Sequence, residues 1–247
     1  ERKAYCSRAV DAFVANKDLI AEELCWQMGR PIRYAAGEVA SFADRSNHMI
    51  SISEAALAPI QTTHKEGFTR YITHEPVGVV LVIAPWNYPL HTPINAIIPA
   101  LLAGNSVILK HASQTPLCAE RIFEAFKVAG LPDGIFQFLH MDHDSTALVI
   151  QTPEVGAVAF TGSVTAGIAV EEAAAGRFIG VGLELGGKDP AYIRTDADID
   201  YAVECTVDGA FFNSGQSCCG IERIYVHESV YDRYLEKFVA LTQQYVL

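Results

Sequence analysis

The stretch VGVVLVIAPWNYPLHTPINAIIPALLAGNSVILK, residues 77–110, decides the fold. It opens with Val77–Ala84, a continuous apolar run rich in Val and Ile, which is typical of a strand buried on both faces of a parallel sheet. A turn and a helix that runs to Ala103 follow, and Ser106–Lys110 then predicts a second strand. A strand, a helix and a strand in this order predict one right-handed crossover of a parallel sheet.

Strand and helix patterns alternate on both sides of this stretch. The further strands that we expect are Phe68–His74 (exposed), Ile135–Leu139, Val155–Phe160, Phe178–Leu185, Ala191–Ile193 and Arg223–Val226. The helices that we expect are one that ends near Gly29-Arg30-Pro31, then Ile32–Leu57, Thr115–Ala129, Ile199–Phe212 and a last helix after it. This alternation predicts a doubly wound α/β fold with a parallel sheet.

The composition limits the classes of partner. The chain has 247 residues, of which 50% are hydrophobic and 19% charged, so it can build a core. Its net charge of −11 repels phosphate backbones, and we expect no nucleic-acid partner. The longest apolar runs, Val77–Trp86 and Ala96–Ala103, are far shorter than the roughly 20 residues of a membrane helix. We therefore expect no membrane partner either.

Cysteine usage and the first residues bear on the compartment. Six cysteines in a chain of this length do not form a disulfide scaffold, and free thiols are typical of a reducing compartment. The segment Glu1–Val10 is charged and lacks the apolar core of a signal peptide. From these two observations we expect a cytoplasmic protein.

Polar residues follow several of the predicted strands directly. In open α/β sheets ligands bind at the carboxyl ends of the strands, so the shared position of these residues indicates a ligand site. They are Asn87, Lys110, Thr161-Gly162-Ser163, Glu184 and Gly215-Gln216-Ser217-Cys218-Cys219.

Cys218 is the candidate nucleophile, because a thiol in a glycine-flanked turn can approach a ligand closely. Cys219, the next residue, is the alternative nucleophile. Adjacent cysteines do not have the spacing of zinc ligands, and we expect no metal. The other four cysteines are expected to be buried structural residues.

Glu184 is the candidate general base. It stands in an apolar run, and burial is expected to raise the pKa of its carboxyl group toward neutrality. The alternative is a carboxylate that pairs with Lys188 or caps backbone amides. Asn87 has two N–H donors, as an oxyanion site needs, and its alternative is turn chemistry.

Two further features fit a phosphate-bearing ligand. Residues 162–167, Gly-Ser-Val-Thr-Ala-Gly, open a helix after a buried strand, and the amides of such a helix N-terminus favour phosphate. The alternative is an ordinary serine N-cap. Lys110 ends a buried strand, where it binds ribose or phosphate, or pairs with a carboxylate.

These residues together resemble the aldehyde dehydrogenase superfamily over nearly the whole chain, from about Ala9 to Leu247. The motifs that carry the resemblance occur in the family's order: Ala84–Pro89 is similar to its P-W-N-[FY]-P turn, Gly104–Lys110 to its G-N-x-V-x-x-K strand, Phe160–Ser163 to its F-T-G-S turn, Leu183–Lys188 to its L-E-L-G-G-K signature, and Phe212–Cys218 to its G-Q-x-C signature.

The resemblance implies a role for each matching residue. It implies Cys218 as nucleophile, Glu184 as general base and Asn87 as oxyanion donor. It implies a cofactor site, for NADP or NAD, formed by Trp86, Lys110, Ser113, Thr161, Gly162, Ser163 and Gly167. It also implies a Rossmann-like dinucleotide-binding domain over 1–186, with an oligomerisation hairpin near 67–76, and the start of a second α/β catalytic domain over 187–247. A homo-oligomer is expected for the complete protein.

Two departures from the family pattern concern specificity. NAD-specific members often carry Glu three residues after the strand lysine, where this chain has Ser113. A glutamate would repel a 2′-phosphate and serine does not, so we expect NADP to be used. The string Lys110–Ser113 is similar to shorter bacterial succinate-semialdehyde dehydrogenases. However, the segment Tyr88–Ala100 offers no Arg for a substrate carboxylate, only His91, Thr92 and Asn95.

The predicted activity is therefore oxidation of an aldehyde through a thioester on Cys218. Family chains are about twice as long, so the resemblance implies a truncated second domain and an isolated chain that does not turn over. Two alternatives stay open: a dehydrogenase that releases the thioester to coenzyme A, and a dinucleotide-binding protein without catalysis. Glu184 argues against the first, and the set Cys218, Glu184 and Asn87 against the second.

Overall fold

The computed structural model describes residues 1–245, and the chain divides into two compact units, Glu1–Glu184 and Leu185–Leu247. The last two residues of the predicted second domain, Val246 and Leu247, lie outside the described residues. Within residues 1–245, no helix is both long enough and apolar enough to cross a membrane.

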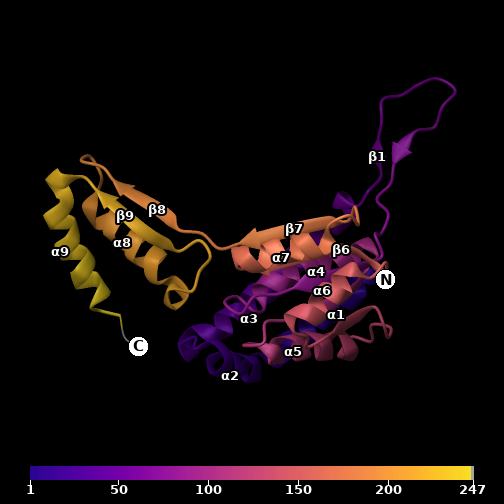
Figure 1. The fold of residues 1–247 in the computed structure, drawn as a ribbon, viewed down its shortest axis with the longest axis horizontal. Helices are drawn as coiled ribbons and strands as arrows, with labels where there is room; N and C mark the ends of the chain where they lie inside the picture. Colours follow the sequence, from indigo (N-terminus) through magenta and orange to yellow (C-terminus); the bar gives the residue numbers. More distant parts are fainter. Residues whose placement is uncertain (246–247) are drawn as a thin grey trace. The chain divides into compact units, whose positions relative to one another are not determined.

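The first unit is built on a five-stranded sheet (Figure 1). The strand order is β5-β4-β3-β6-β7, and β3 pairs in parallel with β4 on one side and with β6 on the other. The strands are β3 Val79–Ile83, β4 Ser106–Lys110, β5 Phe136–Phe138, β6 Val155–Gly162 and β7 Gly180–Leu185. The order reverses at β3, which confirms the predicted doubly wound α/β fold.

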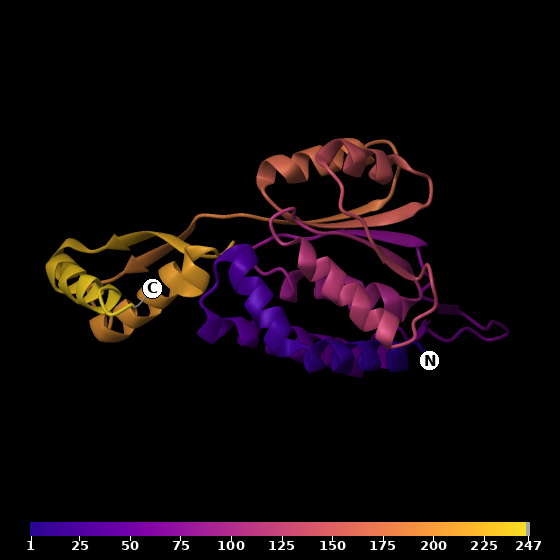
Figure 2. The same cartoon turned by 90° about the horizontal axis from the view of Figure 1, so that it is seen from below.

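Helices cover both faces of this sheet, as Figure 2 shows. One face carries α4 and α5, which are themselves covered by α1, α2 and α3, and the other face carries α6 and α7. The helices are α1 Arg2–Ala15, α2 Lys17–Met28, α3 Ile32–Ala56, α4 His91–Ala103, α5 Pro116–Val128, α6 His143–Gln151 and α7 Val164–Ala174.

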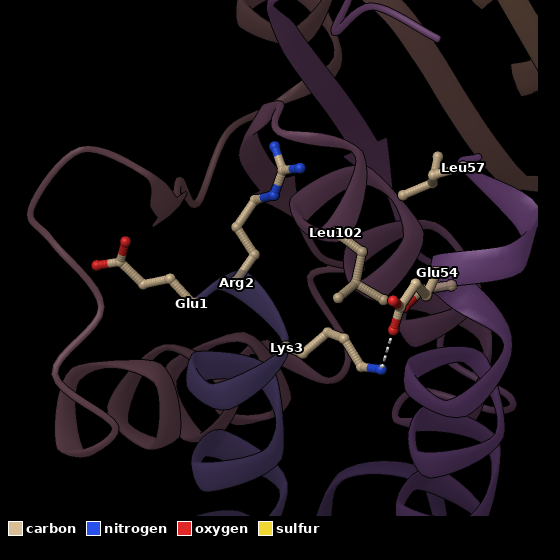
Figure 3. Close-up of a pocket in the computed structure, with 7 residues that line it drawn as sticks. Glu1, Arg2, Lys3, Glu54, Leu57 and Leu102 are labelled. Atoms are coloured by element: carbon tan, nitrogen blue, oxygen red, sulfur yellow. Dashed lines mark ion pairs between the residues drawn. The ribbon is translucent and has the colours of Figure 1, made fainter. Parts of the chain in front are cut away.

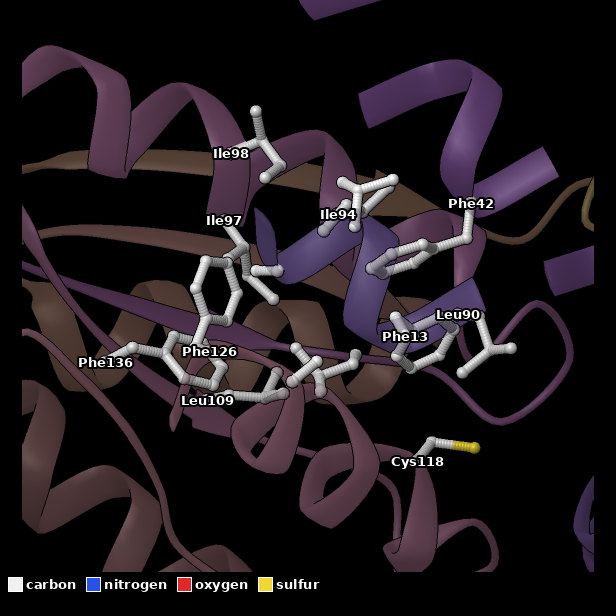
Figure 4. Close-up of a cluster of buried hydrophobic side chains, with 14 of the residues drawn as sticks. Phe13, Phe42, Leu90, Ile94, Ile97, Ile98, Leu109, Cys118, Phe126 and Phe136 are labelled. Atoms are coloured by element: carbon white, nitrogen blue, oxygen red, sulfur yellow. The ribbon is translucent and has the colours of Figure 1, made fainter. Parts of the chain in front are cut away.

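The core of the first unit forms around α4 (Figure 4). Leu90, Ile94, Ile97 and Ile98 recur at steps of three and four and are fully buried. Helix α4 contacts the sheet through β3 and β4 and the outer layer through α1 and α3. Its apolar side chains therefore join the sheet to the outer helices, where Phe13 stacks on Phe42 with 4.1 Å between ring centroids.

The second unit is a single β–α–β element followed by a helix. Strand β8 (Asp189–Ile193) pairs in parallel with β9 (Ile221–Val226), and α8 (Ile199–Phe211) connects them. Helix α9 (Tyr231–Thr242) packs on α8. The apolar core of this unit has few buried members: Ile193, Ile199, Val203, Val207 and Tyr234.

Two details differ from the expectations. The first predicted helix is divided at Asn16 into α1 and α2, and Gly29 ends α2 in the left-handed conformation. The hairpin expected near 67–76 lies earlier, because β2 (Tyr71–Ile72) pairs in antiparallel fashion with β1 (Ile60–Gln61). In Figure 1 this hairpin extends away from the sheet and helices of the first unit.

Candidate functional site

The carboxyl ends of three neighbouring strands lie in register. Ile83, the last residue of β3, is opposite Lys110 of β4 and also opposite Phe160 of β6. The segments that leave these strands are therefore brought to one edge of the sheet. This places the Asn87 turn, the Lys110 segment and the Thr161-Gly162 segment together, as the sequence predicts for a ligand site.

Asn87 stands in the turn between β3 and α4 and is half-buried. Its Oδ1 accepts a hydrogen bond from the Tyr88 backbone N–H at 3.1 Å, so part of the predicted turn chemistry is present. This contact turns the Oδ1 atom of the Asn87 side chain toward the backbone of the turn, so the Nδ2 donor lies on the opposite side of the side-chain amide. Trp86, on the preceding side, is 37% exposed.

Lys110 is a buried cation without a carboxylate neighbour. Its exposure is 8%, and within residues 1–245 its ammonium group forms no ion pair or hydrogen bond. The alternative of a structural pair with a carboxylate is therefore wrong. Burial lowers the pKa of Lys110 because desolvation disfavours the charged form. Ser113, three residues later, is exposed in the turn before α5.

The phosphate candidates lie where β6 passes into α7. Strand β6 continues through Thr161 and Gly162, and Ser163 is the N-cap of α7. The Ser163 hydroxyl accepts a hydrogen bond from the Ala166 backbone N–H at 3.2 Å, which confirms the capping alternative for this side chain. Gly167 is buried in the first turn of α7.

Gly162 is required by a close approach. A Cβ atom at this position would lie 2.7 Å from Cζ of the Phe160 ring. A larger residue would displace that ring, which lies in register with the end of β3.

Glu184 is exposed, and the expected burial of its carboxyl group is wrong. It lies on β7, the edge strand of the sheet, in which exposed and half-buried residues alternate. Gly180 and Gly182 share its exposed face and have no side chains to cover it. The alternative partner is wrong as well, because Lys188 pairs with Glu222.

Cys218 lies in the second unit, in the turn between α8 and β9, and is exposed like Cys219. Asn213, Ser214 and Gly215 precede it with φ angles of 53°, 59° and 73°, a left-handed run that turns the chain sharply. Desolvation and the neighbouring Cys219 thiol raise the pKa of Cys218.

The Gly-Gly segment after β7 approaches the nucleophile segment closely. A Cβ atom at Gly187 would lie 3.3 Å from the Cys218 carbonyl oxygen and 3.1 Å from the Asp189 carboxylate. Glycine at position 187 therefore leaves room for the Cys218 backbone within the second unit.

Three buried polar side chains that the sequence analysis did not identify pack against the Asn87 turn: Arg30, Glu38 and His111. A signal for Glu38 was available, since it lies on the same face of α3 as the buried Ala35 and Phe42. His111 gave a weaker signal, as the residue after Lys110.

Two further features do not belong to this site. A pocket at the start of α1 is lined by Glu1, Arg2, Lys3, Ser53, Glu54, Leu57 and Leu102, none of which is a predicted site residue (Figure 3). Among the residues that the structure describes, no group of three or more His, Cys, Asp and Glu side chains is arranged to hold a metal ion.

Comparisons with known proteins give a consistent result. The sequence model of the aldehyde dehydrogenase family matches residues 1–247. The succinate semialdehyde dehydrogenase (NAD(P)+) Sad of Escherichia coli is 36% identical, over 93% of this chain and 49% of that protein. The succinate-semialdehyde dehydrogenase (NADP(+)) 1 of Mycobacterium bovis is 35% identical, over 97% of this chain and 53% of that protein.

A solved structure agrees with these sequence relatives. The crystal structure of PnpE in complex with nicotinamide adenine dinucleotide matches with a TM-score of 0.93 at 30% identity, over 99% of this chain and 50% of that one. The chain spans about half the length of the curated relatives it matches.

Proposed function

This chain belongs to the aldehyde dehydrogenase family, and we propose that the protein that carries it oxidises an aldehyde to a carboxylic acid with NAD(P)+. The observation that carries this proposal is the register of Ile83, Lys110 and Phe160 at the carboxyl edge of the sheet. It gathers the Asn87 turn, a buried cation and the start of α7 at the position where open α/β sheets bind ligands.

The residues at this edge fit a dinucleotide. Lys110 offers an ammonium group that no carboxylate neutralises, which suits ribose hydroxyls or phosphate. The N-terminus of α7 supplies backbone dipoles that favour phosphate, with Gly162 and Ser163 leading into it. Trp86 and Thr161 lie at the same edge and would also contact the dinucleotide. Ser113 carries no negative charge, so the 2′-phosphate of NADP is tolerated.

The names of the relatives support the same cofactors. The Escherichia coli protein is named for NAD(P)+ and the Mycobacterium bovis protein for NADP(+). Both names also specify succinate semialdehyde, which makes this aldehyde the first one to test. In this proposal residues 1–186 bind the dinucleotide, and 187–247 begin the catalytic domain.

The proposed mechanism is covalent. The Cys218 thiolate adds to the aldehyde carbon, and the Asn87 amide N–H donates to the oxyanion that forms. A bound nicotinamide would supply the acceptor for the hydride that this carbon loses. A thioester on Cys218 results. Glu184 then takes a proton from water, the water oxygen attacks the thioester carbonyl, and the C–S bond breaks to release the acid.

The exposure of Glu184 supports its role, because its carboxylate is accessible to water. This role also separates the proposed reaction from the alternative in which coenzyme A takes the acyl group. An enzyme that transfers its acyl group to a thiol has no need of a base for water.

The subunit contacts of the complete protein are also a proposal. The hairpin of β1 and β2 exposes Ile60, Phe68, Tyr71 and Ile72, which are more than half exposed. Exposed apolar side chains on a projecting hairpin are typical of a protein–protein contact. We assign this hairpin to homo-oligomer formation.

Glu184→Gln tests the mechanism in the complete protein that carries this chain. The substitution removes the base and keeps the shape, so we expect one burst of reduced cofactor without steady turnover. Mass spectrometry of the quenched protein is expected to find the acyl group on Cys218. Cys218→Ala is expected to abolish the burst, and Cys219→Ala to retain it.

The assignments of the general base and of the nucleophile can each be contradicted. Normal turnover by the Gln variant, or a wild-type requirement for coenzyme A, would replace hydrolysis by acyl transfer to a thiol. A dead Cys219→Ala variant beside an active Cys218→Ala variant would move the nucleophile by one residue.

A further inference from the structure

The turn that carries Asn87 is held from behind by buried side chains. Glu38 of α3 accepts hydrogen bonds from the backbone N–H groups of Leu90 at 3.0 Å and His91 at 3.4 Å. Its other carboxylate oxygen pairs with Arg30, whose guanidinium lies 5.5 Å from the centroid of the Tyr88 ring. These contacts fix the side of the turn that leads into α4.

His111 holds the same turn from the sheet. Its Nε2 lies 2.8 Å from the Pro89 carbonyl oxygen, and its Nδ1 lies 3.0 Å from the Thr115 hydroxyl. His111 is 2% exposed and Thr115 is fully buried. Both ring nitrogens therefore have a protein partner in a site without access to water.

These partners fix the protonation of the ring. A carbonyl oxygen can only accept, so Nε2 carries the proton that it donates to Pro89. Desolvation lowers the pKa of His111 to about 4, which leaves the ring neutral at physiological pH. Nδ1 is then an acceptor, and the Thr115 hydroxyl donates to it.

Because of its position in the chain, His111 connects the Asn87 turn to the end of β4. His111 directly follows Lys110, and the Lys110 carbonyl accepts a hydrogen bond from the Ala84 N–H at 2.9 Å. Ala84 begins the segment that leads to Asn87. The ends of β3 and β4 are thus joined twice, once through the backbone and once through the His111 ring.

We propose that His111 is a positioning residue that holds Asn87 in place relative to Lys110 through its hydrogen bond to the Pro89 carbonyl. The inference rests on the proposed function, because it takes Asn87 as oxyanion donor and Lys110 as cofactor ligand. Loss of the bond loosens the turn and misplaces the Asn87 amide, while Lys110 remains on β4. The effect falls on kcat, and KM for the cofactor is retained.

A double-mutant cycle in the complete protein tests the inference. His111→Leu fills the space without a donor and is expected to lower kcat about tenfold, with KM for the cofactor within about threefold. In an Asn87→Ala background the same change is expected to cost less than about twofold, because the residue it positions is absent. His111→Gln, whose Nε2 can still donate to Pro89, is expected to restore most of kcat.

A second pair of variants keeps the inference testable if the Leu variant does not fold. Thr115→Val removes the hydroxyl that holds Nδ1 and releases the Nε2–H tautomer, so kcat is expected to fall several-fold. Thr115→Ser keeps the hydroxyl and is the matched control. An equal loss of kcat from the Val and Ser variants would overturn the inference.

The outcomes distinguish this inference from the proposed function. Normal kcat for His111→Leu, or an equal loss with and without Asn87, would overturn the positioning role alone. Normal turnover by Asn87→Ala would overturn the oxyanion assignment, and the positioning role with it.

Discussion

At the scale of single residues, the segment that leaves β4 sets the charge that a dinucleotide meets. Lys110 contributes an unneutralised cation, and Ser113 follows it without a charge of its own. An acidic residue at position 113 would oppose a 2′-phosphate through Coulomb repulsion, which weakens with distance and with the polarity of the surroundings.

Ser113→Glu is therefore expected to weaken NADP binding about tenfold and to change NAD binding little, since two charges a few ångströms apart near a surface repel by about 1–3 kcal/mol. Fluorescence titration of both cofactors measures this. Ser113→Gln, which has the same size as Glu without its charge, is the control and is expected to retain NADP. Equal weakening of both cofactors by Glu would show a steric effect instead.

The neighbour of the nucleophile affects its ionisation. Desolvation raises the pKa of Cys218 first, and the Cys219 thiol raises it further. Cys219→Ala removes the second contribution, so the alkylation of Cys218 by iodoacetamide is expected to reach its half-maximal rate at a lower pH. Peptide mass spectrometry over a pH series measures this midpoint. Cys205 is exposed, so its expected burial is wrong, and Cys205→Ala is expected to leave the midpoint unchanged.

The buried ring of His111 makes stability depend on pH. The pKa of His111 falls from 6.5 to about 4 on folding. Between these two pH values the ring is protonated in the unfolded chain and neutral in the native protein. The contribution of His111 to the free energy of unfolding is fully present above about pH 6.5. It is lost as the pH drops toward 4, which lowers the free energy of unfolding by about 3 kcal/mol.

Urea denaturation of wild type and His111→Gln at pH 7.5 and pH 4.5 tests this linkage. The difference in stability between the two proteins is expected to shift in favour of the Gln variant at the lower pH. Glu38, whose pKa is raised by burial, titrates in both proteins and cancels in the comparison. A constant difference at both pH values would show that His111 is not buried neutral.

At the scale of elements, the sequence patterns predict the bounds of helices and strands well where burial is uniform along the element. Strand β4 has the predicted bounds, and α3 ends one residue earlier than predicted. The apolar run around Glu184 predicts a buried carboxyl group, yet β7 occupies the sheet edge and Glu184 is exposed. Position within a sheet depends on pairing between distant segments, which an apolar run does not encode.

At the candidate site too, local sequence patterns do not show contacts between residues that are far apart in the chain. The motif residues were found because glycines and polar side chains mark the ends of strands. Glu38 and His111 were missed because their roles depend on contacts with residues 52 and 22 positions away in the chain. Strand β1 was missed because two residues carry no alternation pattern.

The contact between β6 and the segment before β3 gives a prediction for an element. A Cβ atom at Gly156 would clash with the Val77 carbonyl oxygen and lie 2.9 Å from its carbon, and backbone atoms cannot rotate away. Gly156→Ala is expected to destabilise the first unit by about 2 kcal/mol or more, measured by chemical denaturation.

Gly37→Ala is the matched control for this substitution. Gly37 lies in α3 with no atom within 4 Å of its Cβ position, so the alanine is expected to stabilise by about 0.5–1 kcal/mol. Equal effects at both positions would mean that β6 does not approach Val77 closely.

At the scale of the whole molecule, the two units differ in the means that stabilise them. The first has a five-stranded sheet covered on both faces, whereas the second buries few side chains around a two-stranded sheet. Tyr192 and Tyr225 are paired across β8 and β9 and are both more than half exposed. A two-stranded sheet with a small core is marginal by itself.

Hydrogen exchange in this chain is therefore expected to be faster in β8 and β9 than in β3 and β4, by on the order of 100-fold.

Two N-cap variants test whether each unit opens by itself. Asp198 caps α8 through the N–H groups of Asp200 and Tyr201, and Asp142 caps α6 through that of Ser145. Loss of a cap costs about 1 kcal/mol, so Asp198→Ala is expected to speed exchange about fivefold in the second unit and leave β3 unchanged. Asp142→Ala is expected to speed exchange in the first unit only. Equal acceleration of both units by either variant would show that the chain opens as one cooperative body.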